Sequence, residues 1–172
     1  MIIETPRTIL RMLTLDDLDA VSAVFSNPEV MKYLGETCLP ISREESQSIV
    51  ESILRLWQRK GFGRMAVISK ADDKLIGIAG LRFFEGDAEL FYLLDEPYWR
   101  KGLATEIGRE ILRYGFETHD FPRIIAVTRP ANKATLRVLE KLGLKFEKSD
   151  MIVGVFASIY QISKEDFEAS EK

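Results

Sequence analysis

The segment Trp99–Thr105, within the run YWRKGLATE, holds the residues whose types and spacing could do chemistry. A helix that begins here would offer unpaired N–H groups at the positive end of its dipole, and such groups bind phosphate. Gly102 allows a ligand to come close to the main chain, and Ala104 keeps the next inward position small. Arg100 and Lys101 add positive charge at the same point. The segment therefore predicts a local phosphate site.

Two other kinds of phosphate loop can be tested against this spacing. A dinucleotide fingerprint counted from Gly102 needs glycine where Ala104 and the bulky Ile107 stand. A nucleotide-triphosphate loop needs Gly-Lys-Ser/Thr, which the chain lacks. Both alternatives are weak. A tight helix start beside a solvated basic pair explains the same residues equally well, so the loop alone does not decide between a ligand site and a structural turn.

A second polar pair lies one β-α unit further along, in RPANKATLRVLEKLGL. Asn132 and Thr135 are three residues apart, so both point from the first turn of a helix toward the strand ends. Asn132 by itself fits an N-cap, which satisfies a free N–H of that turn. Its place after the phosphate loop makes a ligand contact the competing interpretation for both residues.

These residues must be held by a series of strands and helices. Apolar, β-rich runs predict strands over 8–12, 65–69, 75–84, 89–94, 123–128, 144–147 and 151–162. Helical spacing predicts helices from Thr14 to a stop at Asn27 and Pro28, from Ser42 to Gly61, over 105–116 and over 130–142. The order β-α-α-β-β-β-α-β-α-β-β predicts an α+β fold, a mixed sheet with helices on both faces. Only the charged tail 163–172 is expected to be loose.

Cap signals support the helix ends. Thr14 with Asp17, and Ser42 with Glu45, have the three-residue spacing of a capping box or its aspartate equivalent. Gly143 follows the last predicted helix, where a residue that tolerates positive φ suits a C-terminal cap.

Composition narrows the function further. The 172 residues are 46% hydrophobic, which fits one domain over 1–172. A net charge of -3 gives no global cationic field, so we expect no nucleic-acid partner. No apolar run approaches the ~20 residues of a membrane span, and charges interrupt the opening MIIETPRTILRML, so a cytoplasmic protein without a membrane partner is expected. Cys38 and His119 are the only cysteine and histidine, which excludes an intrachain disulfide and a clustered His or Cys metal site.

The chain resembles the GNAT superfamily of N-acetyltransferases, and within it the RimJ/RimL-type branch. The resemblance is carried by five segments: TILRMLTLDDLDAV, SNPEVMKYLG, GFGRMAVISKADDKLIGIAGL, AELFYLLDEPYWRKGLATE and NKATLRVLEKLGLKFE. It covers nearly the whole chain and implies the acyl-coenzyme A N-acyltransferase fold, with a mostly antiparallel sheet. Trp99, Gly102 and Ala104 occupy the places of the family's loop pattern, although tryptophan departs from its usual Gln or Arg.

This resemblance implies acetyl-coenzyme A as co-substrate and no metal. Main-chain N–H groups from Arg100 to Thr105 would hold the pyrophosphate, and the strand Tyr92–Leu94 would pair with the pantetheine arm. An N–H near Leu93 would polarise the thioester, and Asn132 would contact the pantetheine end. The implied cofactor-binding residues are Tyr92, Leu93, Leu94, Trp99, Arg100, Lys101, Gly102, Leu103, Ala104, Thr105, Asn132 and Thr135.

The implied reaction is direct attack of a primary amine on the acyl thioester. Glu89 is the candidate proton acceptor. The alternative interpretation, given equal weight, is that Glu89 is only an exposed carboxylate at the end of a strand. Glu85 is the second candidate for the proton acceptor. Thr135 is the candidate donor to the departing thiolate, or a binding residue only. The acceptor would be a protein N-terminus or a small-molecule amine, and the negative charge slightly favours a cationic one. The sequence leaves open whether the protein is a monomer or a homodimer.

Two other functions fit the same residues. The fold could retain acyl-coenzyme A as a sensor or scaffold without transfer, since Gly102, Ala104 and Asn132 serve both. An interaction protein could instead use apolar residues of the second long helix, such as Trp57, at a partner surface.

Overall fold

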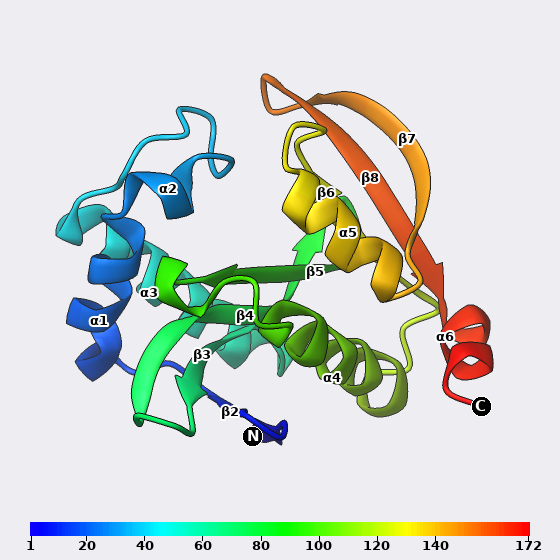
Figure 1. Cartoon of the computed structure of the whole chain (residues 1–172), viewed down its shortest axis with the longest axis horizontal. Coiled ribbons are helices and arrows are strands. Elements are labelled where there is room, and N and C mark those ends of the chain that lie inside the picture. The colour runs from blue at the N-terminus through cyan, green and yellow to red at the C-terminus, as the bar shows by residue number, and fades with distance from the viewer.

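The computed structural model describes residues 1–172 and joins eight strands in one sheet, in the order β1-β2-β3-β4-β5-β6-β8-β7 (Figure 1). The strands are β1 Ile2–Glu4, β2 Thr8–Arg11, β3 Arg64–Ser69, β4 Lys74–Phe84, β5 Asp87–Leu94, β6 Arg123–Thr128, β7 Lys145–Ile152 and β8 Val155–Ser163. Neighbouring strands are antiparallel, except that β5 and β6 are parallel. The predicted mixed, mostly antiparallel sheet is confirmed.

The parallel pair of strands is short. β5 and β6 are in register only at Ala88 with Ile124 and at Glu89 with Ile125. β5 then continues to Leu94 along β4 alone. One edge of the segment 90–94 is therefore left without a strand partner, in the middle of the sheet.

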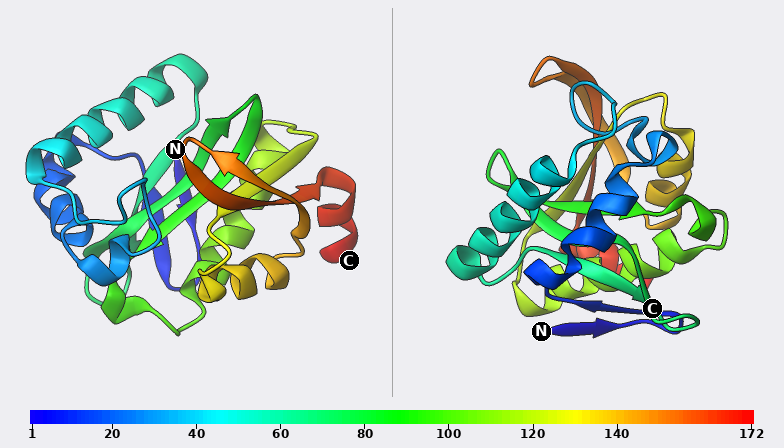
Figure 2. Two further views of the ribbon diagram at one scale, coloured as in Figure 1. Left: turned by 90° about the horizontal axis from the view of Figure 1, so that it is seen from above. Right: turned by 90° about the vertical axis from the view of Figure 1, so that its left-hand side faces the viewer.

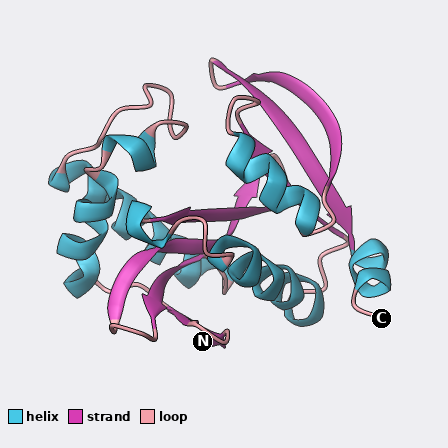
Figure 3. Ribbon diagram, viewed as in Figure 1, coloured by secondary structure: helices cyan, strands magenta, loops and turns pink.

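Helices cover both faces of the sheet, as predicted. They are α1 Leu18–Phe25, α2 Pro28–Met31, α3 Arg43–Lys60, α4 Leu103–Thr118, α5 Lys133–Lys141 and α6 Lys164–Ser170. α1 and α3 pack together over one face, and α4 and α5 lie over the other (Figures 2 and 3). None of the helices has the length and apolar character needed to cross a membrane.

The helix caps follow the local sequence. The Ser42 hydroxyl accepts from Glu45 N at 3.1 Å, and the Glu45 carboxylate accepts from Ser42 N at 2.7 Å, so this capping box is confirmed. Asp17 accepts from Thr14 N at 2.9 Å, but it caps a short 3-10 turn that leads into α1. Gly61 and Gly143 follow α3 and α5 and have φ of 72° and 84°. Both therefore have the positive φ that was predicted for glycine at the C-terminal end of a helix.

Four boundaries differ from the predictions. The tail is not loose, because Ser163 caps α6 and Phe167 is buried against the core. The first helix stops at Asn27 and Pro28, as predicted, but a second short helix, α2, begins there at once. Asn27 is the N-cap of α2, and proline suits the first position of a helix. The strand β1 was missed. The last hairpin turns at Val153 and Gly154, so β7 runs through residues 148–150, where no strand was expected.

Candidate functional site

The predicted loop connects β5 to α4, as the sequence analysis expected. Gly102 is the N-cap of α4, with φ of 77°, and Arg100 also has a positive φ of 61°. No main-chain N–H from Arg100 to Thr105 donates to a protein acceptor. Six consecutive donors therefore remain free at the positive end of a 16-residue helix, beside two exposed basic side chains.

The loop is held in place from both sides. Trp99 donates from Nε1 to the carbonyl oxygen of Leu94 at 2.7 Å, which folds the indole back on the end of β5. Arg7, from the segment before β2, donates from Nη1 to the carbonyl oxygen of Lys101 at 2.7 Å and from Nε to Glu106 at 2.8 Å. The loop is thus fixed with its amides free for a ligand.

Arg7 was not among the predicted site residues. It lies 94 residues before Lys101 in the chain, and no local motif links the two. Its guanidinium comes within 3.5 Å of the position that a Cβ on Gly102 would occupy. Burial raises the pKa of Glu106, but hydrogen bonds from Thr5 and Arg7 outweigh burial and leave this pKa below its usual value. The carboxylate next to the phosphate loop is therefore charged and neutralised by Arg7.

The second predicted pair lies across the open edge of β5. Asn132 accepts from Thr135 N at 3.2 Å, so its N-cap role is confirmed. The Thr135 hydroxyl is 3.2 Å from the hydroxyl of Tyr92 on β5, and the two form a hydrogen bond. Burial raises the pKa of Tyr92 to about 12. The sequence analysis expected Tyr92 only to line the cofactor, and the structure joins it to the proposed thiolate donor.

The main-chain groups of β5 alternate in direction. The Leu94 carbonyl bonds Trp99 and faces away from β4, whereas Asp95 N donates to β4. Alternation along the strand then turns the N–H of Leu93 toward β4 and those of Tyr92 and Leu94 toward the open edge. The contact between a main-chain N–H near Leu93 and the thioester stays a prediction. The N–H groups of Tyr92 and Leu94 are better oriented for this contact than that of Leu93.

Glu89 lies where β5 and β6 begin to separate. It is 1% exposed and accepts two hydrogen bonds from Arg82, at 2.6 and 2.8 Å. The alternative of an exposed strand-end carboxylate is therefore wrong. Glu85 stands exposed in the β4–β5 turn and is not among the residues that line the nearby cavity.

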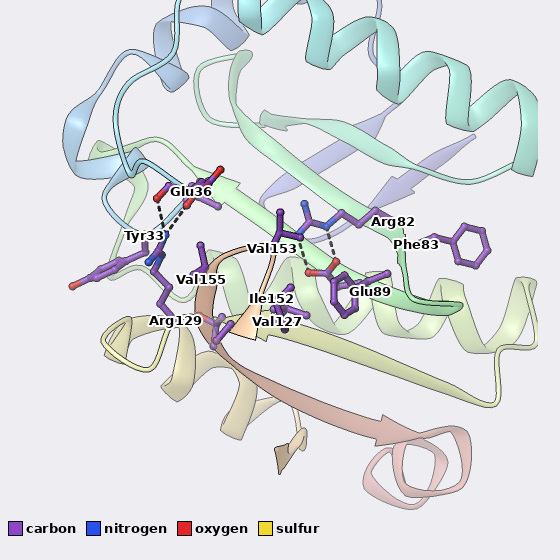
Figure 4. A pocket seen from close by; sticks show the side chains of 15 residues that line it. Tyr33, Glu36, Arg82, Phe83, Glu89, Val127, Arg129, Ile152, Val153 and Val155 are labelled. Carbon is purple, nitrogen blue, oxygen red and sulfur yellow. Dashed lines mark hydrogen bonds and ion pairs between the residues drawn. The ribbon is translucent and has the colours of Figure 1, made fainter. Parts of the chain in front are cut away.

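The Glu89 cavity has a volume of about 440 Å³, and Figure 4 shows the side chains that line it. Its lining comes from the segment after α2, the β4–β5 hairpin, the end of β6 and the β7–β8 hairpin. The lining residues are Tyr33, Leu34, Gly35, Glu36, Arg82, Phe83, Phe84, Glu89, Val127, Thr128, Arg129, Ile152, Val153, Val155 and Ala157. The sheet order brings these segments together.

Trp57 does not form a partner surface. Its side chain is 7% exposed, and Nε1 donates to the carbonyl oxygen of Arg64 at 2.9 Å. A Cβ on Gly63 would lie 2.6 Å from the indole nitrogen, so the packing is close. The hypothesis of an interaction protein that uses this residue is therefore wrong.

Known sequences match this chain over most of its length. Residues 7–145 match the family model described as Acetyltransferase (GNAT) domain. The "Uncharacterized N-acetyltransferase YoaA" of Bacillus subtilis (strain 168) is 34% identical over 149 residues, covering 85% of this chain and 84% of the relative. The "Uncharacterized N-acetyltransferase p20" of Bacillus licheniformis is 31% identical over 147 residues, covering 83% and 82%.

Solved structures share the whole architecture. An acetyltransferase of the GNAT family from Bacillus anthracis superposes with a TM-score of 0.82 at 27% identity, over 96% of this chain and 99% of that one. RimL, a ribosomal L7/L12 alpha-N-protein acetyltransferase solved with coenzyme A, gives 0.82 at 18% identity, over 95% and 98%. The second likeness concerns the fold alone.

Proposed function

The chain belongs to the GNAT acetyltransferase family and is an acetyl-coenzyme A-dependent N-acetyltransferase, and we propose that its donor lies between the loop Trp99–Thr105 and the open edge of β5. One observation carries this placement. Six free amides stand at one end of that edge, and the buried carboxylate of Glu89 stands at the other. A diphosphate at the amides and an acyl group near Glu89 would use both.

The pantetheine arm of the donor would occupy the place that a strand leaves empty. Its amides can pair with the main chain of the segment 90–94, which has no partner on that side. An N–H of Tyr92 or Leu94 would then polarise the thioester carbonyl and stabilise the oxyanion that forms on it.

The transfer step is a direct displacement. The amine nitrogen bonds the acyl carbon, the carbon–sulfur bond breaks, and the proton lost by the amine is balanced by the proton gained by the thiolate. Glu89 would accept the amine proton, directly or through water. The guanidinium of Arg82, 2.6 Å away, bonds both oxygens of this carboxylate and fixes its direction.

Thr135 and Tyr92 would act on the sulfur side. An ordinary thiol has a pKa of about 8.5, whereas burial raises the pKa of Tyr92 to about 12, so the phenol keeps its proton beside a thiolate. We therefore assign the pair a hydrogen-bonding role, in which Tyr92 orients the Thr135 hydroxyl toward sulfur and no proton leaves the phenol.

Three further features belong to the proposal. One sheet and one hydrophobic core through residues 1–172 support a single catalytic domain. The likeness to RimL, together with the motifs around Trp99, supports the RimJ/RimL-type branch. A reducing cytoplasm suits an acetyl-coenzyme A enzyme with one cysteine.

The test is release of free thiol from acetyl-coenzyme A in the presence of an amine and peptide library, with mass spectrometry to identify the acetylated product. We expect release that depends on both substrates. Tight binding of coenzyme A without release across the library would instead identify the chain as an acyl-coenzyme A sensor or scaffold.

A further inference from the structure

The Glu89 cavity has an apolar wall and little spare negative charge. Nine of its fifteen lining residues are hydrophobic. The other six are two acidic residues, two basic residues, a glycine and a threonine: Glu36, Glu89, Arg82, Arg129, Gly35 and Thr128. The charges of the wall therefore balance, although the whole chain is acidic.

Glu89, the buried carboxylate of the cavity, already has a cationic partner. Arg82 bonds both oxygens of Glu89, and the guanidiniums of Arg82 and Arg64 lie 4.8 and 5.2 Å from the centre of the Phe91 ring. The Nε of Arg64 is buried and has no hydrogen-bond partner. Two cations thus surround one anion behind the cavity. A second ammonium group would lose its hydration there without gaining a free carboxylate, which is costly.

The rim holds one acidic side chain, Glu36. Arg129 donates to the carbonyl oxygens of Gly35 and Glu36, at 2.7 and 3.4 Å, and so ties the segment after α2 to the end of β6. Glu36 lies beside the hairpin tip, since its Oε1 would be 3.3 Å from a Cβ on Gly154. Arg129 bonds the main chain of Glu36, so the Glu36 carboxylate is the one acidic group of the wall without an ion pair.

The tip of the β7–β8 hairpin carries an apolar side chain in an unusual position. Val153 and Gly154 turn the hairpin with φ of 47° and 76°. Asn, Asp or Gly normally fill the first of these positions, because a β-branched residue is strained at positive φ. Val153 nevertheless lines the cavity, with 81% of its surface exposed. The strain is consistent with a side chain kept for a ligand.

We propose that the acceptor is a primary amine with an apolar body, and that Val153 contacts this body while the amine faces Glu89. This inference rests on the proposed function and specifies its acceptor. Small hydrophobic amines and peptides with an apolar first residue share the required chemistry. Polyamines and amine-rich antibiotics do not, because nine of the fifteen lining residues are hydrophobic and Glu36 is the only lining carboxylate without an ion pair.

The first experiment compares acceptors at equal concentration. The panel holds phenethylamine, a peptide that begins with Leu, the same peptide beginning with Lys, spermidine and kanamycin. We expect kcat/KM for phenethylamine or the Leu peptide to exceed that for spermidine and kanamycin by at least about tenfold. The higher kcat/KM of these two acceptors shows whether the natural acceptor is a small molecule or a peptide. A preference for spermidine or kanamycin would overturn the proposal.

The second experiment changes the hairpin tip. Asparagine suits the turn better than valine, so Val153→Asn should raise the melting temperature while raising the KM of the apolar amine about three- to tenfold, with the KM of acetyl-coenzyme A unchanged. Met151→Gln, on the same hairpin and outside the cavity lining, is the matched control. Equal amine KM values in the two variants would overturn the role of Val153.

Failure of the proposed function has a different signature. It would appear as no thiol release with any amine of the panel. Titration of phenethylamine and spermidine into the coenzyme A complex then still decides the acceptor class. Binding of phenethylamine supports the proposed apolar acceptor, and binding of spermidine alone contradicts it.

Discussion

The guanidinium of Arg7 donates a 2.7 Å hydrogen bond to the carbonyl oxygen of Lys101 and so joins the first β-hairpin to the phosphate loop. Its other nitrogens bond Glu106, whose carboxylate also accepts from Thr5 at 2.7 Å. This network fixes the carbonyl between two residues of positive φ, Arg100 and Gly102. It therefore holds the six free amides in the direction of the ligand.

Arg7→Gln should weaken donor binding. The variant loses the Lys101 contact and leaves the charge of Glu106 facing the diphosphate, so the KM of acetyl-coenzyme A should rise about three- to tenfold with kcat nearly unchanged. Steady-state kinetics measure both. Arg43→Gln, which breaks an exposed ion pair with Asp19, is the control. An unchanged KM in the Arg7 variant would contradict the role.

Gly102→Ala should reduce donor affinity by tenfold or more, measured by calorimetric titration with coenzyme A. A side chain at φ of 77° costs about 1 kcal/mol in the free protein and also obstructs the diphosphate. Gly61→Ala carries the same conformational cost at φ of 72° and meets no atom within 4 Å, so it separates strain from obstruction. Equal affinity in both variants would argue against the phosphate loop.

Glu89→Gln should lower kcat by about 10²- to 10⁴-fold, the usual range for loss of a proton acceptor. The amide is the same size and keeps part of the contact with Arg82. Glu85→Gln, in the exposed turn, should leave the rate unchanged. A normal rate in Glu89→Gln would exclude this residue as the base.

Thr135→Val and Tyr92→Phe should each slow turnover about tenfold while coenzyme A affinity stays nearly intact. The pKa of Tyr92, raised to about 12, means that its phenol stays protonated up to pH 10 and that its loss leaves the alkaline side of the pH–rate profile unchanged. Thr135→Ser should restore the rate, because it keeps the hydroxyl. An alkaline limb that disappears in Tyr92→Phe would show instead that the phenol transfers its proton.

Local sequence determined the features that depend on a few neighbouring residues. The capping box of Ser42 and Glu45, the C-cap of Gly61 and the N-cap of Asn132 all follow from groups within one helical turn. The same holds for the loop around Gly102, where a strand end, a small residue and a helix start are consecutive. The hairpin turn was missed because valine at its first position hides the usual signal.

The functional partners, in contrast, were decided by the tertiary structure. Burial of Glu89 against Arg82 depends on the β4–β5 register, the bond between Tyr92 and Thr135 depends on where α5 packs, and the Arg7 contact spans 94 residues. The sequence by itself determined the order of elements and the phosphate loop, because hydrogen bonds within a turn and apolar periodicity are local. Which side chains surround the reacting atoms was set only by strand register and packing, because these depend on every element of the sheet together.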